Sequence, residues 1–204
     1  LNTQALLGRV SVTQQESVTA AVSLFADALS NNKMIHTFGT GHSHLLAEEI
    51  FYRAGGLASI YPILDERLML HKEVVKGSQN EHLPDLAKEL LEKHPIAAGD
   101  VVIVISNSGG NQVTIDLVKL AQSLGARVIA VTSINHATSK SARSSAAEKI
   151  HQLADVVLDN SGVVGDASVR VAGSPMSAGP TSTVIGGALL QSVVVGTVAE
   201  CLKR

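Results

Sequence analysis

The apolar positions of the chain follow two patterns that alternate along its length. Short runs rich in β-branched residues, typical of buried parallel strands, occur within Met34–Phe38, Leu57–Leu64, Val101–Ile105, Arg127–Thr132 and Asp155–Leu158. Apolar residues spaced three and four apart predict helices over Val18–Leu29, His44–Ala54, Val113–Leu124 and Thr181–Leu202. This alternation predicts an α/β fold, a three-layer αβα sandwich whose five-stranded parallel sheet has the flavodoxin-like order 2-1-3-4-5.

Local signals refine the ends of these elements. The spacing Thr13-Gln-Gln-Glu16 is typical of a capping box at the start of the first helix. Residues 65–98 contain no strand candidate and are predicted to form a helical excursion, with helices over Glu66–Lys76 and Pro84–His94. A long excursion between strands is often a lid or an interface element.

In two segments nearer the C-terminal end, the apolar residues show no clear periodic spacing. The Ser- and Ala-rich residues 133–149 are expected to lead into a helix near Gln152, and the Gly-, Ser- and Pro-rich segment Asn160–Gly179 is predicted to be a loop. A length of 204 residues suits a single domain over residues 1–204, with an N-terminal helix before the first strand.

The last predicted helix, Thr181–Leu202, is apolar on nearly every side. Glycine and polar residues interrupt its apolar stretch, which argues against a membrane span. We expect burial on more than one face, and a homodimer or homotetramer formed through the N- and C-terminal helices. The residues at its start, Thr181, Ser182 and Thr183, are predicted N-cap residues.

Composition narrows the range of partners. The net charge is only −2, aromatic residues make up 2% of the chain and Trp is absent, so neither a nucleic acid nor a membrane surface is an expected partner. The one cysteine, Cys201, suits a reducing compartment. The sequence opens without the basic and apolar segments of a signal peptide, so a cytoplasmic protein is expected.

A polar loop follows the third predicted strand, in the stretch VVIVISNSGGN. Ser106–Asn111 presents hydroxyls and backbone N–H groups at the N-terminus of a helix, where the helix dipole favours an anion, most often phosphate. The lysine of the GxxxxGK spacing is missing, so the loop is not a nucleotide P-loop. The alternative is an ordinary tight turn between a strand and a helix.

A second loop with the same context, Gly39–Ser43, follows the first predicted strand. In the predicted strand order both loops open into one crevice at the topological switch point. Position 44 is His, and no acidic residue ends the second strand in the expected place, so the loop lacks the dinucleotide fingerprint. A small phosphorylated ligand, with no cofactor, is therefore expected.

The segments ISNSGGNQVTIDLVKLAQSLGARVIAVT and FGTGHS resemble the SIS (sugar isomerase) domain family, and the overall layout resembles phosphoheptose isomerases. The resemblance covers roughly Leu6–Lys203. It implies a sugar phosphate held by serine hydroxyls and backbone N–H groups of the two loops. The residues so implied are Gly41, Ser43, Ser106, Asn107, Ser108, Gly109, Gly110 and Asn111. Asn111 departs from the Ser or Thr common in the family, but an amide can still donate to phosphate.

Isomerisation of an aldose to a ketose needs a base that moves a proton between adjacent carbons. Ala47-Glu48-Glu49 resembles a catalytic stretch of phosphoheptose isomerases but lies about one helical turn closer to the loop serine. His71, on the excursion, is a further candidate acid or base. The resemblance also implies a catalytic His on the last helix, but Thr181–Arg204 contains none, and Gln191 is its only amide.

The remaining histidines carry weaker signals. His42 and His44 flank the loop serine and could approach a ligand or serve surface or capping roles. The others are expected to be ordinary surface or turn residues; they are His82, His94, His136 and His151. No spacing of His, Cys and Asp indicates a metal site.

Three hypotheses follow. The first is a phosphosugar isomerase in which Glu48 or Glu49 and His71 carry protons. The second is a non-catalytic phosphosugar-binding regulator, which the missing C-terminal His favours. The third is an SIS-type lyase or etherase acting on an amino-sugar phosphate.

Overall fold

The computed structural model describes residues 2–142 and 147–204. Its centre is a five-stranded parallel sheet in the order β2-β1-β3-β4-β5, which confirms the predicted topology. The strands are β1 Ile35–Gly39, β2 Ile60–Ile63, β3 Val101–Ile105, β4 Arg127–Thr132 and β5 Val156–Asp159. The helices are α1 Asn2–Thr13, α2 Gln15–Ser30, α3 His44–Glu49, α4 Val74–Asn80, α5 Leu86–Lys93, α6 Gln112–Ser123, α7 Ile134–Ala137, α8 Ile150–Leu153 and α9 Ser182–Cys201.

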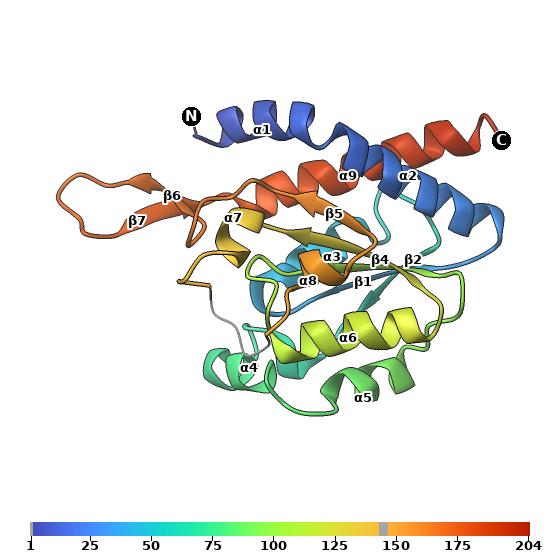
Figure 1. The fold of residues 1–204 in the computed structure, drawn as a ribbon, viewed down its shortest axis with the longest axis horizontal. Coiled ribbons are helices and arrows are strands. Elements are labelled where there is room, and N and C mark those ends of the chain that lie inside the picture. The colour runs from blue at the N-terminus through green and yellow to red at the C-terminus, as the bar shows by residue number, and fades with distance from the viewer. Residues whose placement is uncertain (1, 143–146) are drawn as a thin grey trace.

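Helices cover both faces of the sheet, as Figure 1 shows. On one face α1, α2, α3 and α9 pack against strand residues such as Ile35 and Ile103. On the other face α5, α6 and α8 pack against residues such as Val102 and Val104. All five residues of β3 are buried because this strand lies in the middle of the sheet and is covered on both sides. The helices that follow β1 and β3 therefore lie on opposite faces, as expected.

The N-terminal region differs from its prediction. Helix α1 ends at Thr13, where a capping box was expected, and the first residue before α2 is Gln14, whose side chain makes no capping hydrogen bond. Instead Gln14 Oε1 accepts a hydrogen bond of 2.9 Å from the Asp159 backbone N–H. The capping-box prediction was wrong because the same residues join two helices and tie that junction to β5.

The helix after β1 is shorter than predicted. It ends at Glu49 instead of Ala54, and the backbone turns at Tyr52, which has a φ of 42°, and at Gly55, which has a φ of 75°. Left-handed conformations of this kind end helices. The chain then crosses to β2 without further regular structure.

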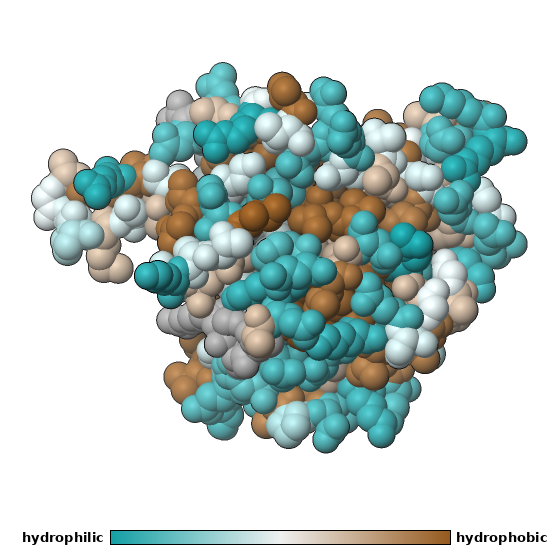
Figure 2. All heavy atoms as spheres, viewed as in Figure 1, coloured by the Kyte–Doolittle hydropathy of each residue, from teal (hydrophilic) through white to brown (hydrophobic). Residues whose placement is uncertain are grey.

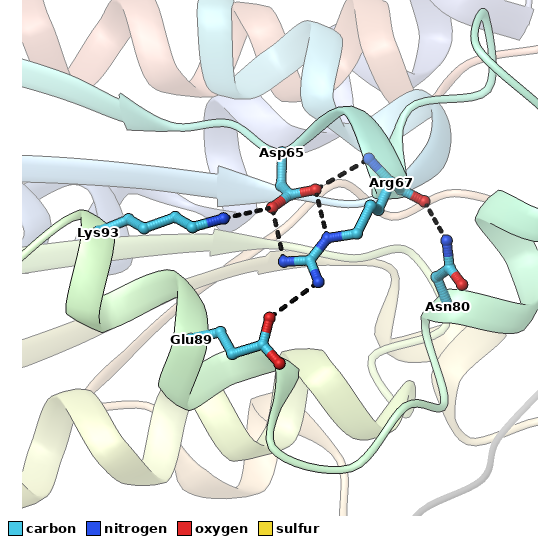
Figure 3. A network of polar contacts seen from close by, with 5 residues as sticks. All are labelled: Asp65, Arg67, Asn80, Glu89 and Lys93. Atoms are coloured by element: carbon cyan, nitrogen blue, oxygen red, sulfur yellow. Dashed lines mark hydrogen bonds and ion pairs between the residues drawn. The ribbon is translucent and has the colours of Figure 1, made fainter.

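The excursion over residues 65–98 contains a short 3-10 turn, η2 (Glu66–Leu68), followed by α4 and α5. The predicted helix over Glu66–Lys76 is therefore wrong, whereas α5 confirms the second predicted helix. Arg67 links these pieces by pairing with Asp65 at 2.9 Å and with Glu89 at 2.8 Å, and Asn80 Nδ2 donates to the Arg67 carbonyl at 2.9 Å (Figure 3). The hydrogen bonds from Arg67 hold the pKa of Asp65 below its usual value. The network fixes the end of α4 relative to β2 and α5.

The segment predicted to be a loop, Asn160–Gly179, contains a hairpin instead. Strands β6 (Ala167–Arg170) and β7 (Ser177–Pro180) pair antiparallel and project from the body of the molecule (Figure 1). At its base Asp166 Oδ1 accepts hydrogen bonds of 3.0 Å from the backbone N–H groups of Thr181 and Ser182. Asp166 thus caps α9, and the predicted capping by the hydroxyls of residues 181–183 is not found, since the N-cap residue Thr181 makes no side-chain capping bond.

Helix α9 is long and apolar enough to span a membrane by composition alone. Packing against α2 and α3 explains part of that composition, while Val184, Val195 and Val198 stay exposed. A Cβ at Gly186 would lie 2.6 Å from Leu46 on α3, and a Cβ at Gly196 would lie 2.6 Å from Val22 on α2. The glycines therefore allow close approach, and α9 is a core helix of the sandwich. Figure 2 shows hydrophilic residues over the outer side of α5 and α6, with apolar residues in an interrupted band nearer the sheet.

The expected helix near Gln152 is present as α8. Part of the Ser- and Ala-rich segment before it, residues 143–146, lies outside the described residues.

Candidate functional site

A cleft of about 470 Å³ opens at the C-terminal ends of the central strands. The strand register places Gly39 beside Ile105 and Ile105 beside Val131, so the segments that follow β1, β3 and β4 begin at the same level. A smaller hollow of about 250 Å³ lies against it and shares His42, Ser43 and Asn107 as lining. The two predicted loops therefore converge on one cleft, at the expected switch point.

The first loop is shaped by two glycines. A Cβ at Gly39 would lie 2.5 Å from the carbonyl oxygen of Ser43, so only glycine allows the loop to fold back on the strand end. Gly41 has a φ of 56°, in the left-handed region that favours glycine. The Ser43 N–H then donates to the Thr40 carbonyl at 3.0 Å. This tight turn directs Ser43 into the cleft.

The second loop is held by a hydrogen bond within it and by contact with α8. The buried Ser106 hydroxyl accepts a hydrogen bond of 3.1 Å from the Gly109 N–H. Gly109 has a φ of 65°, and a Cβ there would lie 3.2 Å from Ile150, the first residue of α8. Ser106 therefore both supports the loop and lines the cleft, together with Ser108 and Asn111.

Two further residues brace this loop. The Asn107 side-chain oxygen accepts a hydrogen bond of 2.9 Å from Asn160 Nδ2, which ties the loop to the segment after β5. The ammonium of Lys149 donates to the Ser108 carbonyl at 3.3 Å. Burial lowers the pKa of Lys149. Sequence reasoning sought a lysine only in the GxxxxGK spacing and missed this one, which arrives from the start of α8.

Glu81 is the main cleft residue that sequence reasoning missed. It follows α4, and its carboxylate bridges the two loops: Oε1 accepts from the Thr40 hydroxyl at 2.5 Å and Oε2 from Asn111 Nδ2 at 2.7 Å. Its backbone carbonyl accepts the Val113 N–H, in the first turn of α6, at 3.1 Å. The excursion carries no motif that marks Glu81, because only the tertiary fold brings it to the loops.

His136 and His82 also line the cleft. Both were predicted to be ordinary surface or turn residues; His82 is exposed, whereas His136 is half-buried in α7. Its Nδ1 accepts a hydrogen bond of 3.2 Å from the Gly165 N–H. Burial lowers the pKa of His136, and the nearby ammonium of Lys149 lowers it further, against an opposing effect of Asp166. A neutral imidazole that accepts at Nδ1 carries its proton on Nε2, so His136 adds a neutral N–H donor to the site.

The predicted binding residues lie together. Six of them line the cleft, namely Gly41, Ser43, Ser106, Asn107, Ser108 and Asn111. Gly109 and Gly110 are buried within the second loop.

The predicted catalytic residues do not converge. The Glu48 side chain is 49% exposed and lies 3.9 Å from His44 Nε2. His71 is exposed, with its ring 5.9 Å from that of His44, and neither Glu48 nor His71 lines the cleft. Glu49 lies in a neighbouring hollow of about 520 Å³, paired with Arg53 and 3.3 Å from Gln191 Nε2.

Residues able to bind a metal do not gather in the described part of the chain: no group of three or more His, Cys, Asp or Glu side chains has the necessary arrangement there. The donors around the cleft are hydroxyls, amides, backbone N–H groups and neutral or basic nitrogens, interrupted by the carboxylate of Glu81. This set suits an oxyanion with attached hydroxyl groups.

The doubly wound sheet with two serine-containing loops at its switch point defines a protein of the SIS class. The SIS domain family model matches residues 2–133, and the chain belongs to that family. Within it, the chain is similar to the UPF0309 protein lin2794 of Listeria innocua serovar 6a, with 42% identity over 98% of this chain and 79% of that protein.

Two solved structures show the same fold at low sequence identity. A phosphoheptose isomerase from Francisella tularensis superposes with a TM-score of 0.63 and 14% identity, covering 96% of this chain and 92% of the other. The Vibrio vulnificus NanR protein complexed with ManNAc-6P superposes with a TM-score of 0.59 and 16% identity, covering 98% of this chain and 61% of the other.

Proposed function

We propose that this protein binds a phosphorylated sugar in the cleft between the two loops and isomerises it between aldose and ketose forms. The observation that carries the proposal is the convergence of Ser43, Ser108 and Asn111 on one cleft at the N-terminus of α6. A dianionic phosphate gains most from several directed donors at a helix N-terminus. The structural neighbours, a phosphoheptose isomerase and a protein complexed with ManNAc-6P, support the same class of ligand.

Proton transfer is the finer part of the proposal. Glu49 is the predicted base that lies nearest the ligand space, because its hollow shares Leu46 and Thr183 with the smaller hollow beside the cleft. Glu48 and His71 remain predictions; each would need a rearranged first loop or a neighbouring copy to reach the ligand. His136, which lines the cleft, would donate its Nε2–H to a ligand oxygen.

The proposal takes residues 1–204 as one SIS domain that works in the cytoplasm as a homodimer or homotetramer. Exposed apolar residues on the terminal helices, Leu7, Val12, Val195 and Val198, support assembly through α1 and α9. The alternative of a non-catalytic regulator is favoured by one observation. The last helix offers the amide of Gln191 to Glu49 where the resemblance implies a histidine.

The experiment begins with a panel of sugar phosphates in a thermal-shift assay. Any stabilising sugar is then followed by NMR for solvent exchange of the proton at C2 and for conversion. Stabilisation with exchange supports an isomerase, whereas stabilisation without exchange or conversion supports the regulator and refutes the isomerase.

Ser108→Ala tests the phosphate assignment. Loss of a hydrogen bond to a charged group costs about 1.5 kcal/mol or more, so the Michaelis or dissociation constant should rise about tenfold. Ser123→Ala is the matched control, because Ser123 is exposed at the end of α6 and its hydroxyl donates to the Leu120 carbonyl at 2.7 Å, away from the cleft. Wild-type constants in Ser108→Ala would remove the phosphate assignment.

A further inference from the structure

The Glu81 side chain accepts hydrogen bonds from both loops, and its backbone carbonyl accepts one from the first turn of α6. The Thr40 hydroxyl belongs to the first loop and the Asn111 amide to the second, and both donate to its carboxylate at 2.5 and 2.7 Å. Oε1 of Glu81 also lies 3.6 Å from the position of a Cβ on Gly41, so the carboxylate sits against the floor of the first loop. The excursion thus places an anion among the donors of the cleft.

These donors are the kind that a phosphate recruits. A hydroxyl, an amide and a helix N-terminus bind an oxyanion through charge-assisted hydrogen bonds, and a carboxylate is itself such an anion. A phosphate and a carboxylate cannot share the same donors, because two negative charges within a few ångströms repel each other strongly in a partly buried site. Occupation by Glu81 and occupation by a ligand phosphate are therefore mutually exclusive at Thr40 and Asn111.

The way in which α4 is held allows a ligand phosphate to replace the Glu81 carboxylate. The preceding residue, Asn80, is fixed by its 2.9 Å hydrogen bond to the Arg67 carbonyl (Figure 3). Helix α4 itself is short, and Val74 and Val75 on it are 63% and 66% exposed. Because α4 buries little apolar surface, its end is held chiefly by polar links, which can be exchanged for links to a ligand at small cost.

We propose that Glu81 is an internal competitor for the anion subsite formed by Thr40 and Asn111, and that the ligand's phosphate must displace its carboxylate to bind. This inference rests on the proposed phosphosugar function and deepens it. Glu81 then makes the cleft selective for doubly charged ligands. A doubly charged phosphate displaces the carboxylate, whereas a singly charged or neutral sugar does not.

The test measures binding of inorganic phosphate by isothermal titration calorimetry to the wild-type protein, Glu81→Gln and Glu81→Ala. Removing the competing charge should tighten phosphate binding about tenfold or more, the factor that corresponds to one charge-assisted hydrogen bond. Glu73→Gln is the matched control. It removes the same charge from the other end of α4, where Glu73 pairs with Lys76 at 2.8 Å in an exposed position.

The outcomes separate this inference from the proposed function. Tighter binding in both Glu81 variants and unchanged binding in Glu73→Gln support the competitor. Equal or weaker binding in the Glu81 variants, with clear binding by the wild type, overturns it and leaves the phosphosugar site intact. Weaker binding in particular makes Glu81 a brace that holds Thr40 and Asn111 in their binding positions. No binding of phosphate or of sugar phosphates by any variant overturns both.

Amide hydrogen exchange on the wild-type protein tests whether phosphate displaces the Glu81 carboxylate, without the need for a substitution. Displacement of Glu81 should speed exchange over residues 74–83 when phosphate is added, while the second loop becomes protected. Protection of both segments by phosphate contradicts the competitor, because the carboxylate then keeps its place beside the ligand.

Discussion

Gly39→Ala is the sharpest test of how the first loop is built. The added Cβ would lie 2.5 Å from the Ser43 carbonyl oxygen, 2.6 Å from its carbonyl carbon and 2.9 Å from its Cβ. Two of these are backbone atoms, so no rotation of a side chain relieves the overlap. The strand cannot retreat either, because β1 is paired with β2 on one side and with β3 on the other. The loop must move, and such overpacking costs about 1–3 kcal/mol.

Urea unfolding measures this cost, and Gly8→Ala is the control. Gly8 lies in α1 and a Cβ there meets no atom within 4 Å, so alanine should be neutral or stabilise the protein by up to about 1 kcal/mol. The moved loop should also weaken binding of a sugar phosphate in Gly39→Ala. Stability and binding equal to the wild type in Gly39→Ala would refute the close contact with Ser43 and the loop geometry that rests on it.

Two further predictions concern carboxylates that accept hydrogen bonds from backbone N–H groups. Asp166→Ala removes the cap of α9 and should lower the free energy of unfolding by about 1–2 kcal/mol in urea titrations; an unchanged value would show that other groups cap the helix. For Asp100, burial acts to raise the pKa, but two backbone N–H groups and His36 outweigh it and hold the pKa below its usual value. The stability that this carboxylate provides is therefore full above the pKa of the unfolded chain, about 4, and is lost as the pH falls through the lower folded value. The deficit of Asp100→Asn relative to the wild type should shrink between pH 7 and pH 3, and a pH-independent deficit would contradict the assignment.

The sheet and its two loops follow from the sequence because their signals are local. A β-branched run such as Val101–Ile105 has few conformations available other than a buried strand. The small residues after it permit only a tight connection to α6. Once the strand order is known, the meeting of Ser43 and Ser108 is a consequence of parallel topology and needs no side-chain detail.

Other features lay beyond the sequence because tertiary contacts decide them. The Thr13–Glu16 spacing fits a capping box, yet it falls at the junction of α2 with α1, which Leu6 and Val10 anchor in the core. Asp166 caps a helix that begins 16 residues later, and no local pattern links the two. Glu81 and His136 reach the cleft only because their segments fold over the strand ends.

The position of Gln191 bears on where the chemistry resides. Its amide nitrogen lies 3.3 Å from Glu49 Oε1, so the last helix contributes a neutral donor beside this carboxylate. A side-chain amide cannot act as a general acid or base at neutral pH, and Glu49 is further engaged by Arg53. A second proton carrier for an isomerase must then come from elsewhere. The imidazoles that line the cleft, His42, His82 and His136, are the candidates the fold provides, and two of them come from segments outside the two loops. In the proposed function the strand-end loops hold the ligand, whereas the reaction depends on segments whose positions only the folded chain reveals.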